Sequence, residues 1–123
     1  MPVRSSDSSV LKWPDAPTVR RAFEAWAAET ATERRELVAA GYFGSYATGN
    51  WGVGSDLDVV LIVADSDQPF EVRAGRWDLT SLPVPVETLV YTVEEWQALQ
   101  RRDDRFSRML GTDTVWVIPP EVE

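Results

Sequence analysis

Apolar residues near the start of the chain recur every three to four positions. They are Val19, Ala22, Phe23, Trp26 and Ala27. This spacing places all five on one side of an α-helix. Asp15 stands before Ala16-Pro17, and a proline this early in a helix loses no hydrogen bond, because the first N–H groups have no partner in the helix. The pattern therefore predicts an amphipathic helix that begins near Ala16.

Shorter apolar runs, of the kind found in β-strands, follow at four places. They cover residues 37–43, 56–63, 84–91 and 114–118. The second run is β-branched and apolar on both faces beyond its first turn, so we expect it at the centre of a sheet. Pro85 cannot donate a ladder hydrogen bond, which indicates an edge position or an irregular start for the third run.

Two stretches outside these runs differ in how clearly they can be interpreted. Thr92 is followed three residues later by Glu95, which is the pattern of a capping box and predicts a helix through Trp96 and Leu99, with an extension to Met109 left open. Residues 70–82 are compatible with a ragged strand or with a short helix around Trp77, and both interpretations stay open. The aromatic residues expected in the core are Phe23, Trp26, Trp96 and Phe106.

The length and composition of the chain fit one folded domain. A chain of 123 residues, of which 44% are hydrophobic, can build a single core. We expect a flexible arm at residues 1–14, because residues 4–9 are a polar run with little to bury. The domain is then expected at residues 15–118, and residues 119–123 form a short tail.

Charge and composition narrow the chemistry that this domain can perform. The formal net charge of -8 argues against an extended nucleic-acid partner, because such binding depends on clustered Lys and Arg. The absence of cysteine and histidine removes disulfides, thiolate zinc sites and the most common general base. Carboxylates remain, and their hard oxygens suit Mg²⁺, Mn²⁺ or Ca²⁺. No apolar run approaches the roughly 20 residues of a membrane span, so we expect a cytoplasmic protein without membrane contact.

The segment from Gly44 to Asp58 carries the first candidate site. Gly44-Ser45 comes directly after the first predicted strand, where a glycine allows a sharp turn and a close approach of the backbone to a ligand. A short helix that opens at Ser45 directs free N–H groups at an anionic phosphate, and the serine hydroxyl adds a donor. Gly44 and Ser45 are therefore candidate nucleotide-binding residues, and a role of Ser45 as a helix N-cap is compatible with this.

Three acidic residues form the candidate catalytic and metal-binding set. Asp56 and Asp58 stand two apart on the predicted central strand, so both carboxylates face one side while Leu57 faces the other. Two like charges this close repel each other unless cations lie between them. Glu87 lies in the third apolar run, where an ionised side chain is costly without a compensating charge. Together the three acids predict a site for two metal ions, in which Glu87 is also a candidate proton acceptor; the alternative for Glu87 is a solvated acid on an edge strand.

These residues resemble the signature of a known family. Gly44-Ser45, ten further residues and then Asp56-Leu57-Asp58 look like the motif of the minimal nucleotidyltransferases in the DNA polymerase β superfamily. The resemblance covers residues 18–118 and implies an α+β fold, with a mixed β-sheet flanked by helices. By likeness, the Gly-Ser turn contacts a nucleoside triphosphate, most simply ATP, and Asp56, Asp58 and Glu87 bind two Mg²⁺ ions, which Mn²⁺ can replace.

The same resemblance implies an activity and a partner. A nucleoside monophosphate, in the first instance AMP, is transferred to a hydroxyl acceptor. Many minimal nucleotidyltransferases are encoded beside a HEPN-family toxin and act as its antitoxin, in some cases by adding AMP to a tyrosine of the toxin. This implies a HEPN-family protein as partner, and we expect Trp51, in the loop before Asp56, to be exposed and available for such a contact.

One departure from the family keeps a second function open. Family members commonly carry a basic residue where this chain has Thr48. The alternative function is therefore a non-catalytic antitoxin that neutralises its partner by occlusion and retains the acidic residues without using them. A glycosyltransferase with an Asp-X-Asp motif shares the metal chemistry but normally needs a larger domain.

Overall fold

The computed structural model describes residues 13–120. Its elements, in chain order, are α2 (Ala16–Glu33), β1 (Leu37–Phe43), α3 (Ser45–Thr48), β2 (Leu57–Val63), α4 (Phe70–Arg73), the 3₁₀ helix η1 (Ala74–Arg76), β3 (Val86–Thr92), α5 (Val93–Arg101), α6 (Arg105–Asp113) and β4 (Val115–Ile118). Most of the predicted arm at residues 1–14 and of the predicted tail lies outside the described residues. Trp13 is described, and its indole N–H donates to the Tyr46 hydroxyl at 3.3 Å.

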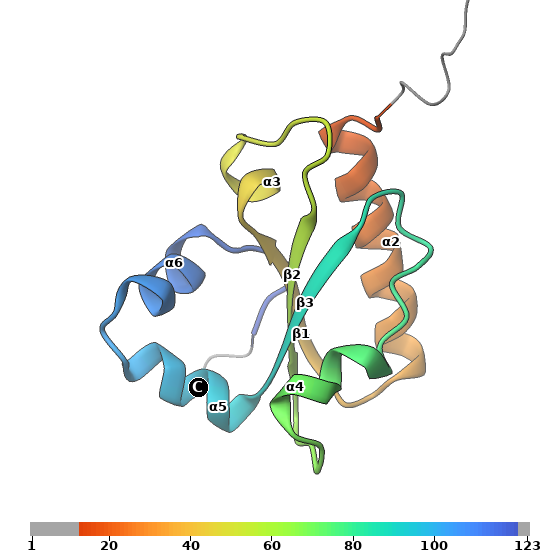
Figure 1. Ribbon diagram of the computed structural model, residues 1–123. Helices are drawn as coiled ribbons and strands as arrows, with labels where there is room; N and C mark the ends of the chain where they lie inside the picture. Colours follow the sequence, from red (N-terminus) through yellow and green to blue (C-terminus); the bar gives the residue numbers. More distant parts are fainter. Residues whose placement is uncertain (1–12, 121–123) are drawn as a thin grey trace, which may run out of the picture.

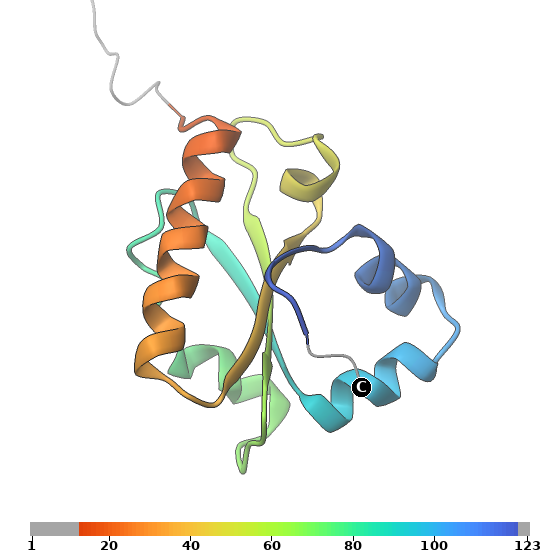
Figure 2. The same ribbon diagram turned by 180° about the vertical axis from the view of Figure 1, so that it is seen from behind.

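The four strands form one mixed sheet in the order β3-β2-β1-β4. β1 pairs antiparallel with β2 and with β4, whereas β2 pairs parallel with β3. Helix α2 covers one face of the sheet, and α5 and α6 cover the other (Figures 1 and 2). The expected α+β fold, a mixed sheet flanked by helices, is confirmed, as are the central position of β2 and the edge position of β3.

The apolar face of α2 packs against the sheet as its spacing predicts. Asp15 caps the helix by accepting a hydrogen bond from the Thr18 N–H at 2.9 Å. Phe23 is fully buried, stacks on Trp26 at 5.8 Å between ring centroids and meets Tyr42 of β1 edge to face at 6.0 Å. Burial of such large rings stabilises the packing of the helix on the sheet.

The C-terminal half contains the predicted helix through Trp96 and Leu99, but the helix does not extend to Met109. The capping box of Thr92 and Glu95 is present, but the helix ends at Arg101. A second helix begins after Asp104, which accepts the Ser107 N–H in a capping box of its own. Two strong start signals within twelve residues thus divide the segment into α5 and α6. Phe106, expected in the core, is 40% exposed because it lies in the first turn of this second helix.

The ambiguous stretch at residues 70–82 is neither one strand nor one helix. It forms α4 and η1 and then an irregular loop that leads to β3. The Trp26 indole N–H donates to the Asp78 carbonyl at 2.7 Å, which anchors the loop to α2. In the described residues, no helix combines the length and the apolar character that crossing a bilayer requires.

A buried arginine ties α4, β3 and α5 together. Arg73, whose side chain is 8% exposed, donates to both carboxylate oxygens of Glu95 at 2.5 and 2.9 Å, and also to the carbonyls of Gln68 and Val90. The hydrogen bond from Arg73 is the main reason that the pKa of Glu95 falls from 4.5 to about 2. The pair therefore stabilises the fold above pH 4.5, and this contribution is lost as the pH falls toward 2.

Replacing Arg73 with methionine is expected to destabilise the protein by about 2 kcal/mol at pH 7. This is less than for a fully buried pair, because the Glu95 side chain is partly solvated. The difference from the unmodified protein should shrink at pH 3, where Glu95 begins to be protonated. Urea unfolding at both pH values measures this. Arg108→Met is the control, because Arg108 and its partner Asp103 are both exposed; an equal loss in both variants would contradict the role assigned to Arg73.

Candidate functional site

The turn between β1 and α3 has the geometry that its glycine predicts. Gly44 adopts φ 77° and ψ -149°, a conformation that is almost restricted to glycine, and α3 begins at Ser45. Gly49 ends this short helix in the left-handed conformation and donates its N–H to the Ser45 carbonyl at 2.9 Å. The first N–H groups of α3 have no partner within the helix. The turn thus presents backbone donors and the Ser45 hydroxyl at one end of the sheet.

Asp58 lies at the centre of a row of residues across this end of the sheet. It pairs with Phe43 of β1 on one side and with Glu87 of β3 on the other. Residues paired in adjacent strands point to the same face, so the Asp58 and Glu87 side chains share the face covered by α5 and α6. Leu57, fully buried, faces α2 instead. Asp56 directly precedes β2. It is two positions before Asp58, so strand alternation places both side chains on the same side.

The Gly44 backbone approaches the Asp58 carboxylate directly. A Cβ atom added to Gly44 would lie 3.2 Å from Asp58 Cγ and closer still to its Oδ2. No side chain larger than hydrogen fits between the turn and this carboxylate. The Gly-Ser turn and the central acid therefore form one continuous surface, although they are 14 positions apart in the sequence.

The acids near Asp58 influence its ionisation. Burial raises the pKa of Asp58, and the negative charges of Glu87 and Asp56 raise it further. Asp56 and Asp58 are half-buried. Glu87 is exposed, so the expectation that burial makes its charge costly is wrong. Because β3 is an edge strand, the charge of Glu87 is solvated, and its proximity to Asp58 comes from strand register instead.

The residues suit a hard divalent cation in their chemistry, although they do not form a closed ligand shell. Carboxylate oxygens are the ligands that Mg²⁺ prefers, and Asp56, Asp58 and Glu87 supply them at one end of the sheet. Within residues 13–120, no three acidic side chains converge closely enough to hold one ion together. The acidic cluster, as we call these three residues, therefore has the composition of a magnesium site with its side chains still apart.

Two other residues considered in the sequence lie between the Gly44 turn and Asp56 in the chain. Thr48 is exposed at the end of α3 and carries no charge toward the turn. Trp51 is not the exposed residue that was expected, since it is half-buried. Its ring stacks on Tyr46 with 5.8 Å between centroids and an interplanar angle of 11°. Trp51 therefore packs the loop onto α3, with only part of its side chain left accessible.

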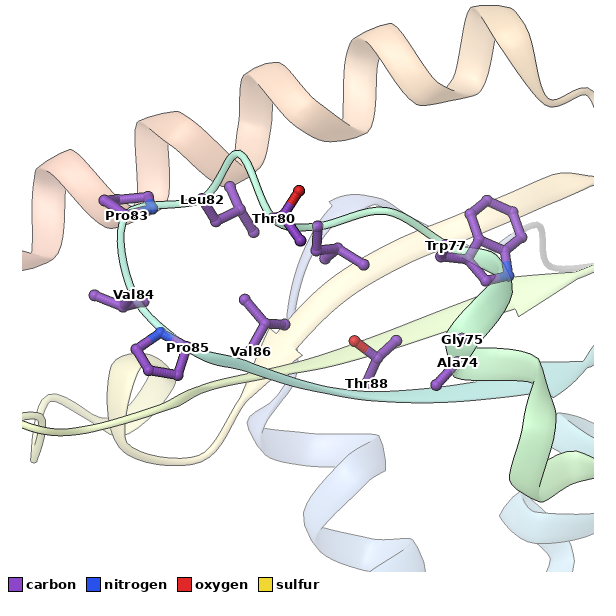
Figure 3. Close-up of a pocket in the computed structure, with 11 residues that line it drawn as sticks. Ala74, Gly75, Trp77, Thr80, Leu82, Pro83, Val84, Pro85, Val86 and Thr88 are labelled. Carbon is purple, nitrogen blue, oxygen red and sulfur yellow. The ribbon is translucent and has the colours of Figure 1, made fainter.

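A cavity that the sequence did not predict lies beside β3. It has a volume of about 640 Å³ and lies between this strand and the loop at residues 77–85 (Figure 3). Its lining includes Trp77, Leu82, Val86 and Thr88. The only sequence signal was the pair of prolines at positions 83 and 85, which keep the loop from pairing regularly with the strand.

Comparison with known proteins is consistent with this geometry. The family model described as "Nucleotidyltransferase domain" matches residues 26–109. Among solved structures, a "putative nucleotidyltransferase" from Sulfolobus solfataricus has a TM-score of 0.58 at 18% identity, over 82% of this chain and 80% of that one. A toxin-antitoxin structure with AMP-PNP has a TM-score of 0.52 at 19% identity, over 76% and 71%.

A further structure is that of the toxin-antitoxin pair MntA-HpeT, in a mutant with two Asp-to-Glu substitutions two positions apart. It has a TM-score of 0.50 at 16% identity, over 76% of this chain and 70% of that one. No curated protein matches the chain in sequence. The structural likenesses, all below 25% identity, support the fold, and the family model covers more than half of the chain. The chain therefore belongs to the nucleotidyltransferase domain family.

Proposed function

We propose that this protein transfers AMP from ATP to a hydroxyl group, with divalent metal ions held by Asp56, Asp58 and Glu87. The observation that carries the proposal is the row across the sheet, in which Gly44 touches Asp58 and Asp58 pairs with Glu87. Donor phosphates on the turn would lie directly beside the acidic cluster. Binding a triphosphate and binding cations are then mutually supportive, because each neutralises the charge of the other.

Different residues of the site have different roles in this reaction. Gly44 and Ser45 hold the phosphates through backbone N–H groups and the serine hydroxyl. The acceptor oxygen forms a bond to the α-phosphorus, the bond from this phosphorus to the oxygen of the β-phosphate breaks, and pyrophosphate leaves. The proton of the acceptor passes to the Glu87 carboxylate or to water. Two Mg²⁺ ions bound by the acidic cluster would stabilise the negative charge on the attacking and leaving oxygens.

The structural neighbours support the choice of nucleotide and partner. One of them is a toxin-antitoxin structure with AMP-PNP, an analogue of ATP. By this likeness we propose ATP as the donor and a toxin as the partner. The resemblance of the Gly-Ser and Asp-X-Asp motifs to the minimal nucleotidyltransferases extends the proposal to a HEPN-family toxin, with a tyrosine hydroxyl as the acceptor.

The rival function is neutralisation of a toxin by occlusion alone. Two observations favour it: Thr48 offers no positive charge to the phosphates, and the three described acids do not converge on one point. Both are compatible with a domain that has kept the fold and lost the reaction. The rival makes no use of ATP, which separates it from the leading proposal.

Incubation with ATP labelled at the α-phosphate, Mg²⁺ and the protein encoded beside this one is expected to label the partner. Labelling should depend on Mg²⁺ and stop when EDTA is added, because the acidic cluster needs cations to hold the triphosphate. ATP labelled at the γ-phosphate is the control and should leave the partner unlabelled. Stoichiometric inhibition of the partner with no label transferred would instead establish the occlusion function.

A further inference from the structure

The outer edge of β3 offers unpaired backbone groups beside the acidic cluster. Among residues 13–120, β3 is the last strand of the sheet and pairs with β2 alone. The Leu57 N–H donates to the Pro85 carbonyl, so Pro85 and, by alternation, Glu87 direct their backbone groups toward β2. Val86 and Thr88 direct theirs outward. Val90 is two residues after Thr88, so its carbonyl also points away from β2. This carbonyl accepts a hydrogen bond from Arg73 of α4, which confirms the outward direction.

Nothing in the described part of the chain pairs with this edge at Val86 or Thr88. The loop at residues 77–85 passes nearby but stays on the far side of the cavity of about 640 Å³ (Figure 3). The side chains of Val86 and Thr88 extend from the strand into this gap, and Leu82 extends into it from the loop. Open backbone groups and an adjacent apolar cavity together form what we call the edge slot.

The edge slot matches an extended peptide better than a compact small molecule. An extended peptide that pairs with β3 as an added strand forms hydrogen bonds with the outward N–H and C=O groups. Every second side chain of this peptide then enters the neighbouring cavity. The volume is within the range of about 300–1,000 Å³ that is typical of ligand sites, and exceeds what one side chain fills. The nearby negative charge of Asp56, Asp58 and Glu87 favours a segment that carries positive charge.

Strand alternation then decides which peptide residue reaches the acidic cluster. In an antiparallel pair, the peptide residues opposite Val86 and Thr88 share their face and enter the cavity. The residue between them lies opposite Glu87 and points to the face of the acidic cluster. Because Glu87 occupies a non-hydrogen-bonded position, the Cα atoms of this pair approach to about 4.5 Å, which is the closer of the two spacings.

We propose that the edge slot docks the acceptor as an added antiparallel strand, with two apolar residues in the cavity and the hydroxyl-bearing residue between them beside Glu87. This rests on the proposed function and adds to it the form of the acceptor. The donor lies on the β1 side of Asp58 and the acceptor on the β3 side. The acceptor oxygen bonds to the α-phosphorus from that side, its proton passes to Glu87 or water, and pyrophosphate leaves toward Gly44 and Ser45.

A capped probe peptide, acetyl-Lys-Val-Tyr-Val-Lys-amide, tests the docking without any need for catalysis. Amide hydrogen exchange followed by NMR is expected to slow at Val86 and Thr88 when the peptide is added. At about 90% occupancy the exchange should slow roughly tenfold, because only the free fraction exchanges. A second assay with α-labelled ATP and Mg²⁺ is expected to label the tyrosine of the same peptide.

Matched variants separate strand pairing from other modes of binding. Methylation of the two valine nitrogens should abolish protection, because these N–H groups face β3, whereas methylation of the tyrosine nitrogen should not. On the protein, Thr88→Pro removes an outward N–H that the sheet does not use and should abolish protection at Val86. Thr88→Val keeps the N–H and the shape, and should retain it. Circular dichroism of both variants reports the fold.

The outcomes distinguish the docking from the chemistry. Protection that is absent, or that is equal for both methylated peptides, would overturn the edge slot as the docking site. Label on the peptide without protection at Val86 and Thr88 would overturn it too. Selective protection with no label on the tyrosine would overturn the placement of the hydroxyl beside Glu87. If, in addition, no acceptor of any kind is labelled, the proposed function fails while the docking stands.

Discussion

Asp58→Asn is expected to abolish nucleotide transfer while the protein stays folded. Asp58 lies between the Gly44 turn and Glu87 in the row across the sheet, so loss of its charge affects both the cations and the triphosphate. We expect a fall in the rate on the order of a thousandfold or more, as for loss of a group that stabilises charge in the transition state. Label transfer to the acceptor under single-turnover conditions measures this.

The stability of the same variant is expected to move in the opposite direction. Burial raises the pKa of Asp58, and the negative charges of Glu87 and Asp56 raise it further, so the carboxylate is both poorly solvated and repelled by its neighbours when no cation is present. A neutral amide of similar size removes this repulsion, and the thermal midpoint without metal should be equal or higher. Asp65→Asn, in the exposed loop after β2, is the control and should leave the rate unchanged. Full activity of Asp58→Asn would remove the acidic cluster from the mechanism.

Gly44→Ala is expected to lower both stability and activity. The backbone conformation of Gly44 alone makes alanine cost about 1–3 kcal/mol. The new methyl group would also collide with the Asp58 carboxylate, which must then move away from its place in the row. Urea unfolding measures the first effect. Label transfer, at a temperature where the variant remains folded, measures the second.

Gly49→Ala is the matched control for this prediction. Gly49 also has a positive φ, of 90°, but a Cβ there meets nothing within 4 Å. The left-handed backbone is expected to cost about 1–2 kcal/mol with little change in activity. Combining Gly44→Ala with Asp58→Ala should recover part of the stability, since the collision disappears. Strictly additive losses in this pair would show that the contact between turn and acid does not constrain the site.

Much of the fold could be predicted because its signals are local. The cap at Asp15, the capping box of Thr92 and Glu95, and the strand boundaries at residues 37–43 depend on residues within a few positions of each other. The end of α5 was left open because the second cap, at Asp104, competes with helix continuation. The irregular loop after η1 was missed because its path depends on Trp26, which is more than 50 positions away.

The candidate site was predictable in its members but not in its arrangement. Asp56 and Asp58 share a side through strand alternation, and the turn at Gly44 follows from glycine. Glu87 was selected for a wrong reason, since it is exposed rather than buried. What brings it to Asp58 is the parallel register of β2 and β3, and a one-residue shift in that register would turn Glu87 to the opposite face.

The sequence by itself determined which residues carry chemistry and which local structures hold them, because hydrogen bonds of caps and turns and the alternation of strands act over short separations. Only the tertiary structure decided that Gly44 touches Asp58, that β3 lies beside β2 with Glu87 in register, and that an edge slot opens along Val86 and Thr88. These depend on strand order and loop path. Both are set by packing between segments far apart in the chain, which a pattern of period two does not encode.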